Sequence, residues 1–183
     1  MSEVIWRGIA RILAKPAIAN AIIRYAQRTP YFHLPCDEDP SYMKRWWVFN
    51  RYRLDNGKPR FRWCPWSVRV HHILREDRER HIHDHPWNAR TIILRGFYVE
   101  YRENAEFESM TPSNPSNPEF EVKLRQAGDT ATLGHNRYHC IRQVSDGGVY
   151  TLFISGPWQG VWGFLVNGVK IPWRTYLRME SDE

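Results

Sequence analysis

The chain of 183 residues has few cysteines, no long apolar run and no evident internal repeat. Its three cysteines are widely spaced and form no Cys-x-x-Cys pair, which argues against a disulfide framework. No stretch approaches the roughly 20 apolar residues of a membrane-spanning helix, and the first residues lack the apolar core of a signal peptide. We therefore expect a soluble, cytoplasmic protein with reduced thiols and no transmembrane segment.

The composition is that of one packed domain. Hydrophobic residues make up 42% of the chain and aromatic residues 14%, enough for a sizeable core at this length. The net charge of +6 and the isoelectric point near 9.4 mildly favour anionic partners.

The first 28 residues indicate two short helices. Apolar side chains recur at helical spacing from residue 3 to residue 28, and Pro16 should break the run. The segment is also basic, so it could contact nucleic acid or an anionic membrane. We favour the alternative, in which the helices cap the main fold or form a homodimer interface, because core packing alone requires apolar periodicity.

From residue 44 onward the sequence has the features of β-structure. Aromatic and β-branched runs alternate with Gly-containing turns at residues 55–57, 146–148 and 167–168, which predicts a sandwich or barrel of six to eight mostly antiparallel strands. The segment 109–118, rich in Pro, Ser and Asn, is expected to be an exposed loop. The expected strands cover residues 44–54, 61–74, 91–102, 149–155, 161–166 and 169–173.

Residues 71–85 contain five histidines, and the last three, His81, His83 and His85, occupy alternate positions. A β-strand would display alternate side chains on one face. Imidazole is the commonest metal ligand in proteins, so this spacing indicates a metal site. The alternative is a solvated, histidine-rich surface strand.

A second cluster, residues 128–139, runs from Gly-Asp through Gly134 to His139. The two clusters together resemble the paired motifs of the cupins. In the first motif a His-x-His is followed by a Glu and then a Gly. In the second, Gly-Asp and Pro-x-Gly precede the last His. The resemblance implies an all-β fold, the cupin double-stranded β-helix or RmlC-like jelly-roll barrel. It would comprise a helical extension (1–40) and a barrel (41–178), with the 109–118 loop joining the two motifs.

The match places His83 and His85 in the His-x-His positions and His139 at the last ligand position. Gly96 closes the first motif at the expected distance, and counting from His81 instead would leave two residues too many. Two positions depart from the pattern. Ala89 stands where the Glu is usual, and Gly134 and Asn136 replace the Pro and Gly of the second motif.

Without the Glu, three neutral imidazoles remain as ligands. The His83–Pro86 segment resembles thiol dioxygenases, which are cupins with a three-histidine ferrous site, and so implies Fe(II) with room for substrate and dioxygen. Zn²⁺ and Ni²⁺ are alternatives, while loss of the carboxylate argues mildly against Mn²⁺. The overall resemblance is greatest to uncharacterised bacterial and phage cupins. These share a His-Asp-His-Pro-Trp segment, here residues 83–87, an Ile-Leu-Arg-Gly strand end, here residues 93–96, and a late Gly-Pro…Trp-Gly-Phe stretch, here residues 156–164.

Several further side chains are candidates for the site. Arg90 stands where animal cysteine dioxygenases carry a cross-linked cysteine, and it could clamp an anionic substrate if it points inward. Strand alternation from His85 puts Arg90 on the other face, where it would meet solvent or a strand neighbour, and the role would then pass to Arg142 or to arginines of residues 51–69. Trp87 shares the parity of His85 and is a candidate pocket wall or a buried structural residue. Tyr138, His135 and His81 are candidate partners of the ligands or proton donors.

Three functions are consistent with these features. The first is a mononuclear non-haem Fe(II) dioxygenase-like enzyme for a small anionic or thiol substrate. The second is a cupin that binds a metal or ligand without turnover. The third is an isomerase or hydrolase that uses Zn²⁺ or Mn²⁺.

Overall fold

The computed structural model describes residues 2–29, 42–52, 59–103 and 120–181. Within these ranges the helices are α1 (Glu3–Leu13), α2 (Pro16–Ala26) and α3 (Trp173–Ser181). The strands are β1 (Met43–Phe49), β2 (Ser67–Ile73), β3 (Ala89–Arg95), β4 (Phe97–Glu103), β5 (Phe120–Gln126), β6 (Thr130–Leu133), β7 (His139–Val144), β8 (Val149–Ser155), β9 (Gly163–Val166) and β10 (Val169–Pro172). No helix of the described residues is long and apolar enough to cross a membrane.

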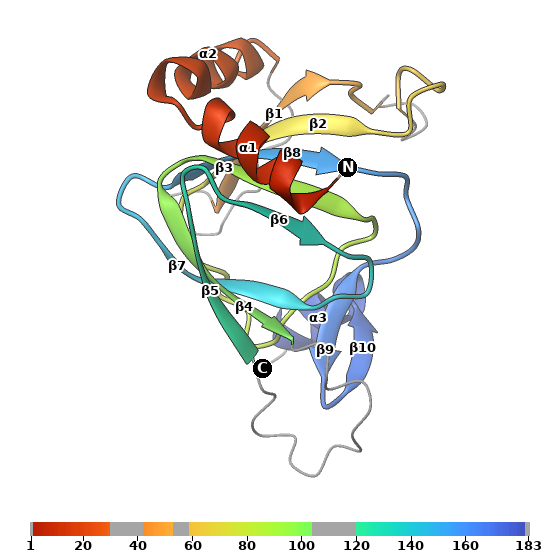
Figure 1. Ribbon diagram of the computed structural model, residues 1–183. Helices are drawn as coiled ribbons and strands as arrows, with labels where there is room; N and C mark the ends of the chain where they lie inside the picture. The colour runs from red at the N-terminus through yellow and green to blue at the C-terminus, as the bar shows by residue number, and fades with distance from the viewer. Residues whose placement is uncertain (1, 30–41, 53–58, 104–119, 182–183) are drawn as a thin grey trace.

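Two antiparallel sheets form the body of the protein (Figure 1). One has five strands in the order β1-β2-β8-β3-β6, and the other has three in the order β5-β4-β7. The chain crosses repeatedly between the sheets, since β3, β6 and β8 belong to the first and β4, β5 and β7 to the second. This winding is the double-stranded β-helix, or jelly roll, implied by the cupin resemblance, although the sheets are not joined into a closed barrel.

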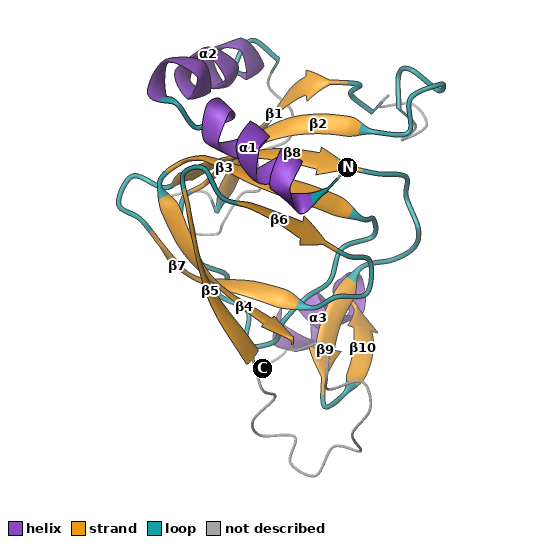
Figure 2. Ribbon diagram, in the orientation of Figure 1, coloured by secondary structure: helices purple, strands orange, loops and turns teal. Residues whose placement is uncertain are grey.

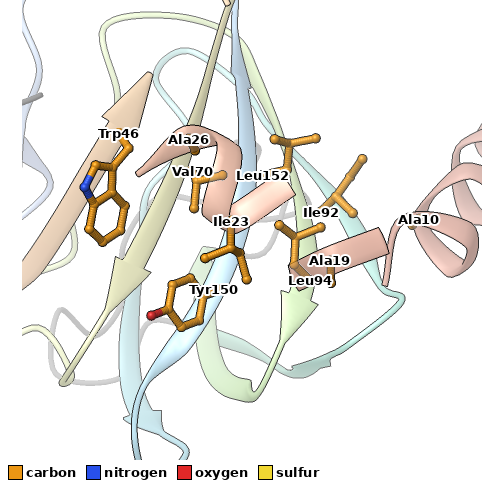
Figure 3. Close-up of a cluster of buried hydrophobic side chains, with 10 residues drawn as sticks. All are labelled: Ala10, Ala19, Ile23, Ala26, Trp46, Val70, Ile92, Leu94, Tyr150 and Leu152. Atoms are coloured by element: carbon orange, nitrogen blue, oxygen red, sulfur yellow. The ribbon is translucent and has the colours of Figure 1, made fainter. Parts of the chain in front are cut away.

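The amino-terminal helices cover the outer face of the five-stranded sheet (Figure 2). Pro16 begins α2, so the predicted break in the helical run is confirmed. Burying such aliphatic and aromatic surface contributes about 1.5–3 kcal/mol per large side chain. The buried residues of this layer, shown in Figure 3, are Ala10, Ala19, Ile23 and Ala26 from the helices and Trp46, Val70, Ile92, Leu94, Tyr150 and Leu152 from the sheet.

A turn at Gly96 divides the single strand predicted for residues 91–102, so that prediction is wrong. The backbone of Gly96 has a φ of +81°, and a Cβ there would lie 2.7 Å from the carbonyl oxygen of Gly148 and from Ser145 Oγ. Only glycine fits such a position without strain. The turn sends β3 into the five-stranded sheet and β4 into the three-stranded sheet, which face each other.

The strand predicted for residues 61–74 begins only at Ser67. The side-chain amide of Asn50 donates to the carbonyl oxygens of Cys64, at 2.9 Å, and Trp66, at 2.8 Å, so the segment before Ser67 is held to a side chain rather than to a strand. Two other predictions, the turn at 55–57 and the loop at 109–118, lie outside the described residues. Helix α3 was not predicted.

Alternation along the strands separates two environments. On β3, Ile92 packs under the helices, whereas Ile93 packs with Tyr98 and Ile141 between the sheets. By the same alternation, the inner face of β2 carries Arg69 and His71 and that of β8 carries Thr151, Phe153 and Ser155. The space between the sheets is therefore lined by polar and aromatic side chains as well as by aliphatic ones.

Candidate metal centre

Three histidines, His83, His85 and His139, come together beside the inner face of the three-stranded sheet. One ring nitrogen from each lies within 4.8 Å of the others. The ring centroids form a nearly equilateral triangle, with separations of 5.3 Å (His83–His85), 5.1 Å (His83–His139) and 5.0 Å (His85–His139). The Nε2 atoms of His85 and His139 are 2.8 Å apart. The structure thus brings together the three residues selected by the motif spacing.

Backbone pairing sets this arrangement. The amide of His83 donates to the carbonyl of His139 at 3.0 Å, and the amide of His139 donates back at 2.9 Å. His83 also bridges Phe164, so its segment lies between β7 and β9. The regular strand expected through residues 81–85 is reduced to this isolated bridge, yet the side chains still alternate, with Ile82 and Asp84 buried between the half-buried histidines.

Glu100, on β4, orients His139. The Nδ1 atom of His139 donates to Glu100 Oε1 at 2.9 Å, and Nε of Arg125 donates to Oε2 at 3.1 Å. Nε of Arg102 lies 2.8 Å from the same Oε2 atom in an ion pair. Burial tends to raise the pKa of this fully buried carboxyl, but the hydrogen bond from His139 and the charge of Arg102 outweigh it and hold the pKa at about 2. An ionised carboxylate only accepts hydrogen bonds, so Nδ1 of His139 carries a proton, and Nε2 is the ring nitrogen that faces His85.

The other two imidazoles are held in their neutral form. Burial lowers the pKa of His83 to about 4, against a smaller raising effect of Asp77, whose Oδ2 lies 4.0 Å from His83 Nδ1. Burial, reinforced by neighbouring histidines, lowers the pKa of His85 well below its usual range. A metal ligand must be an unprotonated imidazole. Three convergent imidazoles, those of His83 and His85 kept neutral by burial, therefore fit a single divalent transition metal ion.

Trp87 lies beside this centre. Its ring meets His85 edge-on at 5.6 Å, and it contacts Phe153 and stacks on Trp158 with centroids 6.2 Å from each. On the other side, Trp162 and Phe164 lie within 5.9 Å of the His83 ring. Aromatic rings thus flank the histidines on two sides.

The three residues predicted as catalytic have other partners. His81 Nδ1 is 2.9 Å from the Tyr176 hydroxyl of α3, and the amide of His135 donates to Asn88 Oδ1 at 2.7 Å. Tyr138 packs with Ile82 and its buried hydroxyl has a pKa raised to about 12. None of these contacts involves His83, His85 or His139. These contacts therefore do not support a catalytic role for the three candidates.

Arg90 faces the helices and not the space between the sheets. Its guanidinium donates to both carboxylate oxygens of Glu3, at 3.2 and 2.5 Å, donates to Thr130 Oγ1 at 3.2 Å, and lies 4.7 Å from the centre of the Trp6 ring. The inward-pointing alternative for Arg90 is therefore wrong, and strand alternation explains why. Arg142 donates to the backbone carbonyls of residues 79 and 80, at 3.4 and 3.3 Å. Neither arginine contacts the histidines through these bonds.

Glu100 was not singled out in the sequence, although it contacts a predicted ligand. A glutamate four residues after the Gly96 turn is the signal that could have drawn attention to it. That signal is weak, because the contact of Glu100 with His139 depends on how β4 pairs with β7. The register of this pairing shifts between Val99 and Glu100, and the sequence does not show that shift. His71 was missed for a similar reason, since its place depends on the pairing of β2 with β8. Arg69 lies within the 51–69 segment whose arginines were named as alternatives to Arg90.

No known family and no curated protein matches this chain. Among solved structures, iron(II) HppE with its substrate is similar at 10% identity and a TM-score of 0.46, over 71% of this chain and 57% of that one. Oxalate oxidase is similar at 10% identity and a TM-score of 0.48, over 80% of this chain and 69% of that one. The vicilin of hazelnut (Corylus avellana) is similar at 5% identity and a TM-score of 0.45, over 67% of this chain and 30% of that one. The chain spans little more than half the length of the HppE chain.

At these identities and scores the three structures do not bear on activity. The fold assignment rests instead on the strand order of this chain. The protein is an all-β jelly roll with a group of three histidines suited to a divalent metal ion.

Proposed function

We propose that this protein is a mononuclear metal-dependent enzyme, a non-haem Fe(II) dioxygenase-like oxidoreductase that acts on a small anionic or thiol substrate. The observation that carries the proposal is the convergence of three imidazoles, one of them oriented by a buried carboxylate. Three protein ligands on one side leave room on a divalent metal for both a substrate and dioxygen. Bound iron would supply the redox chemistry with dioxygen.

The residues around the metal position have separate tasks. His83, His85 and His139 would bind the metal ion, and Glu100 keeps a proton on Nδ1 of His139. The rings of Trp87 and Trp162 exclude water from the sides of the histidine triangle. Because no carboxylate belongs to the ligand set, the positive charge of the metal is left to attract an anionic substrate group.

A second candidate follows from the same ligands. Three imidazoles also suit Zn²⁺ or Ni²⁺, and a protein holding either ion could bind a ligand without oxidising it, or catalyse isomerisation or hydrolysis. Oxygen consumption separates the two candidates, because Zn²⁺ has no redox chemistry.

Anaerobic loading with Fe(II), followed by oxygen-electrode measurements with a panel of small carboxylic acids and thiols, tests the proposal. We expect substrate-dependent uptake of oxygen that is lost in His139→Ala and in the Zn²⁺-loaded protein. Tight metal binding without uptake for any compound would support the second candidate. Equal uptake by wild type and His139→Ala would place the reaction outside the three histidines.

A further inference from the structure

Phe153, on the inner face of β8, is surrounded by nitrogen-bearing side chains. The His71 ring stacks on it at 4.7 Å, the guanidinium carbon of Arg69 lies 5.3 Å from its centre, and the rings of Trp87 and His85 lie at 6.2 Å. Arg69 and His71 come from β2, whose Arg69 pairs in register with Phe153. A cluster of polar groups thus lies next to one of the three metal-site histidines.

Arg69 is the charged member of this cluster. Its side chain is only 3% exposed, and its Nη2 donates to Ser155 Oγ at 3.2 Å. The guanidinium also lies over the rings of Trp47 and Trp87, at 5.3 and 5.4 Å. A guanidinium keeps its charge in proteins, and the neighbouring aromatic rings help to hold this one in place. The inner face of the sheet therefore presents a fixed positive charge.

Two further nitrogens of the cluster are buried without a hydrogen-bond partner among the described residues. They are Nε2 of His71 and Nε1 of Trp87. The His71 side chain is 8% exposed, and burial lowers its pKa, which keeps the imidazole neutral. A buried polar group without a partner costs about 1–3 kcal/mol, so such groups point to a ligand that satisfies them.

We propose that Arg69, His71 and Trp87 form a subsite for the carboxylate group of a small organic acid. The planar fork of Arg69 matches a carboxylate, and the indole N–H and the imidazole add hydrogen bonds to its oxygens. The flanking rings of Trp47 and Phe153 suit a flat, partly apolar molecule. This subsite deepens the proposed function and rests on it, because the rings of His85 and Trp87 each lie 6.2 Å from Phe153 and 5.6 Å from one another.

Calorimetric titration of the Zn²⁺-loaded protein with benzoate tests the proposal. We expect one benzoate per chain and a loss of about 10–100-fold in affinity in Arg69→Gln, the range for a charged hydrogen bond. Arg69→Lys should bind more weakly than wild type, because the ammonium lacks the fork. The matched control is Arg95→Gln, whose guanidinium lies over Tyr150 on the outer face and should not affect benzoate binding.

Trp87→Phe keeps an aromatic ring at that position, removes the indole N–H and makes the ring smaller, so it tests the subsite without deleting a charge. It should weaken benzoate several-fold. Absence of benzoate binding to wild type, or equal affinities in Arg69→Gln and Arg95→Gln, would overturn the subsite. So would inorganic phosphate that binds more tightly than benzoate with the same dependence on Arg69, since that would assign a tetrahedral anion.

The metal content of each variant separates this proposal from the proposed function. We expect one Zn²⁺ per chain in Arg69→Gln and Trp87→Phe, because neither residue is a ligand. A protein that binds benzoate through Arg69 but holds no metal would retain the subsite and contradict the proposed function.

Discussion

His139 Nδ1 and Glu100 Oε1 are 2.9 Å apart, and the glutamate side chain is completely buried. This hydrogen bond joins β7 to β4 and decides which nitrogen of His139 can meet a metal. It also makes Glu100, which is not a ligand, a determinant of the metal site. Partners of this kind typically change metal affinity by 10–100-fold when they are removed.

Glu100→Gln should therefore weaken metal binding by roughly 10–100-fold without changing the stoichiometry. Glutamine has the same shape, but its amide carries no charge and no longer fixes the proton of His139. A competition titration with a chelating dye measures the change. Glu121→Gln is the matched control, because that carboxylate is about half exposed and pairs with Lys123. Equal affinities in the two variants would show that Glu100 does not orient the ligand.

His71 should make the protein less stable in acid. Burial lowers its pKa below the ordinary value of 6.5, so the unfolded chain takes up a proton first as the pH falls. The free energy of unfolding should then decrease below pH 6.5 by up to about 1.4 kcal/mol per pH unit from this one group. Denaturant unfolding at pH 7.5 and 5.5 should show a smaller decrease for His71→Phe than for wild type. The same decrease in both proteins would contradict burial as the cause.

Gly147 and Gly148 offer a matched pair in one turn. Both have a positive φ, but a Cβ on Gly148 would lie 2.6 Å from the carbonyl oxygen of Ile73, whereas a Cβ on Gly147 would meet nothing within 4 Å. Gly147→Ala should cost about 1–2 kcal/mol of unfolding free energy from backbone strain alone. Gly148→Ala should cost clearly more, about 3 kcal/mol or above, because the strand Val149–Ser155 must shift. Equal losses of unfolding free energy in the two variants would show that the close contact with Ile73 is relieved at no cost to stability.

Arg90→Met should leave metal stoichiometry and affinity unchanged, because Arg90 binds Glu3 of α1. The Glu3 side chain is 58% exposed, so loss of the ion pair should change the free energy of unfolding only slightly. Unfolding curves and a metal titration on the same preparation give both values. A loss of metal with little loss of stability would indicate that Arg90 reaches the site after all.

The fold could be predicted largely from local patterns. The break at Pro16 and the Asn167-Gly168 turn depend on residues close together in the sequence, and both appear in the structure. Gly96 was read as the end of a motif and not as a change of sheet, because the clash with Gly148 that requires glycine comes from a segment 52 residues further along the chain. Sequence patterns that compare residues two to four positions apart contain no information on that contact.

The three histidines could be selected from motif spacing, and the spacing also separated His81, which the structure pairs with Tyr176. The groups that contact or neighbour these histidines could not be selected from motif spacing. Glu100 reaches His139 through a register shift between β4 and β7. The arginines of residues 51–69 were candidates as a group, and only the pairing of β2 with β8 singles out Arg69. Hydrophobic periodicity assigns each residue a face of its strand but does not say which strand lies opposite.

Metal analysis of protein purified without a histidine tag or chelators is the most direct test of the central claim. Wild type, His83→Ala and His72→Ala would be saturated with one divalent metal, dialysed and measured for metal per chain by mass spectrometry. His72 is the matched control, because its Nε2 lies 2.9 Å from the carbonyl oxygen of Gly147 and its ring stacks on Tyr150. We predict one metal ion per chain in wild type and His72→Ala, and none retained by His83→Ala. Equal retention by the two variants would contradict a metal centre at His83, His85 and His139.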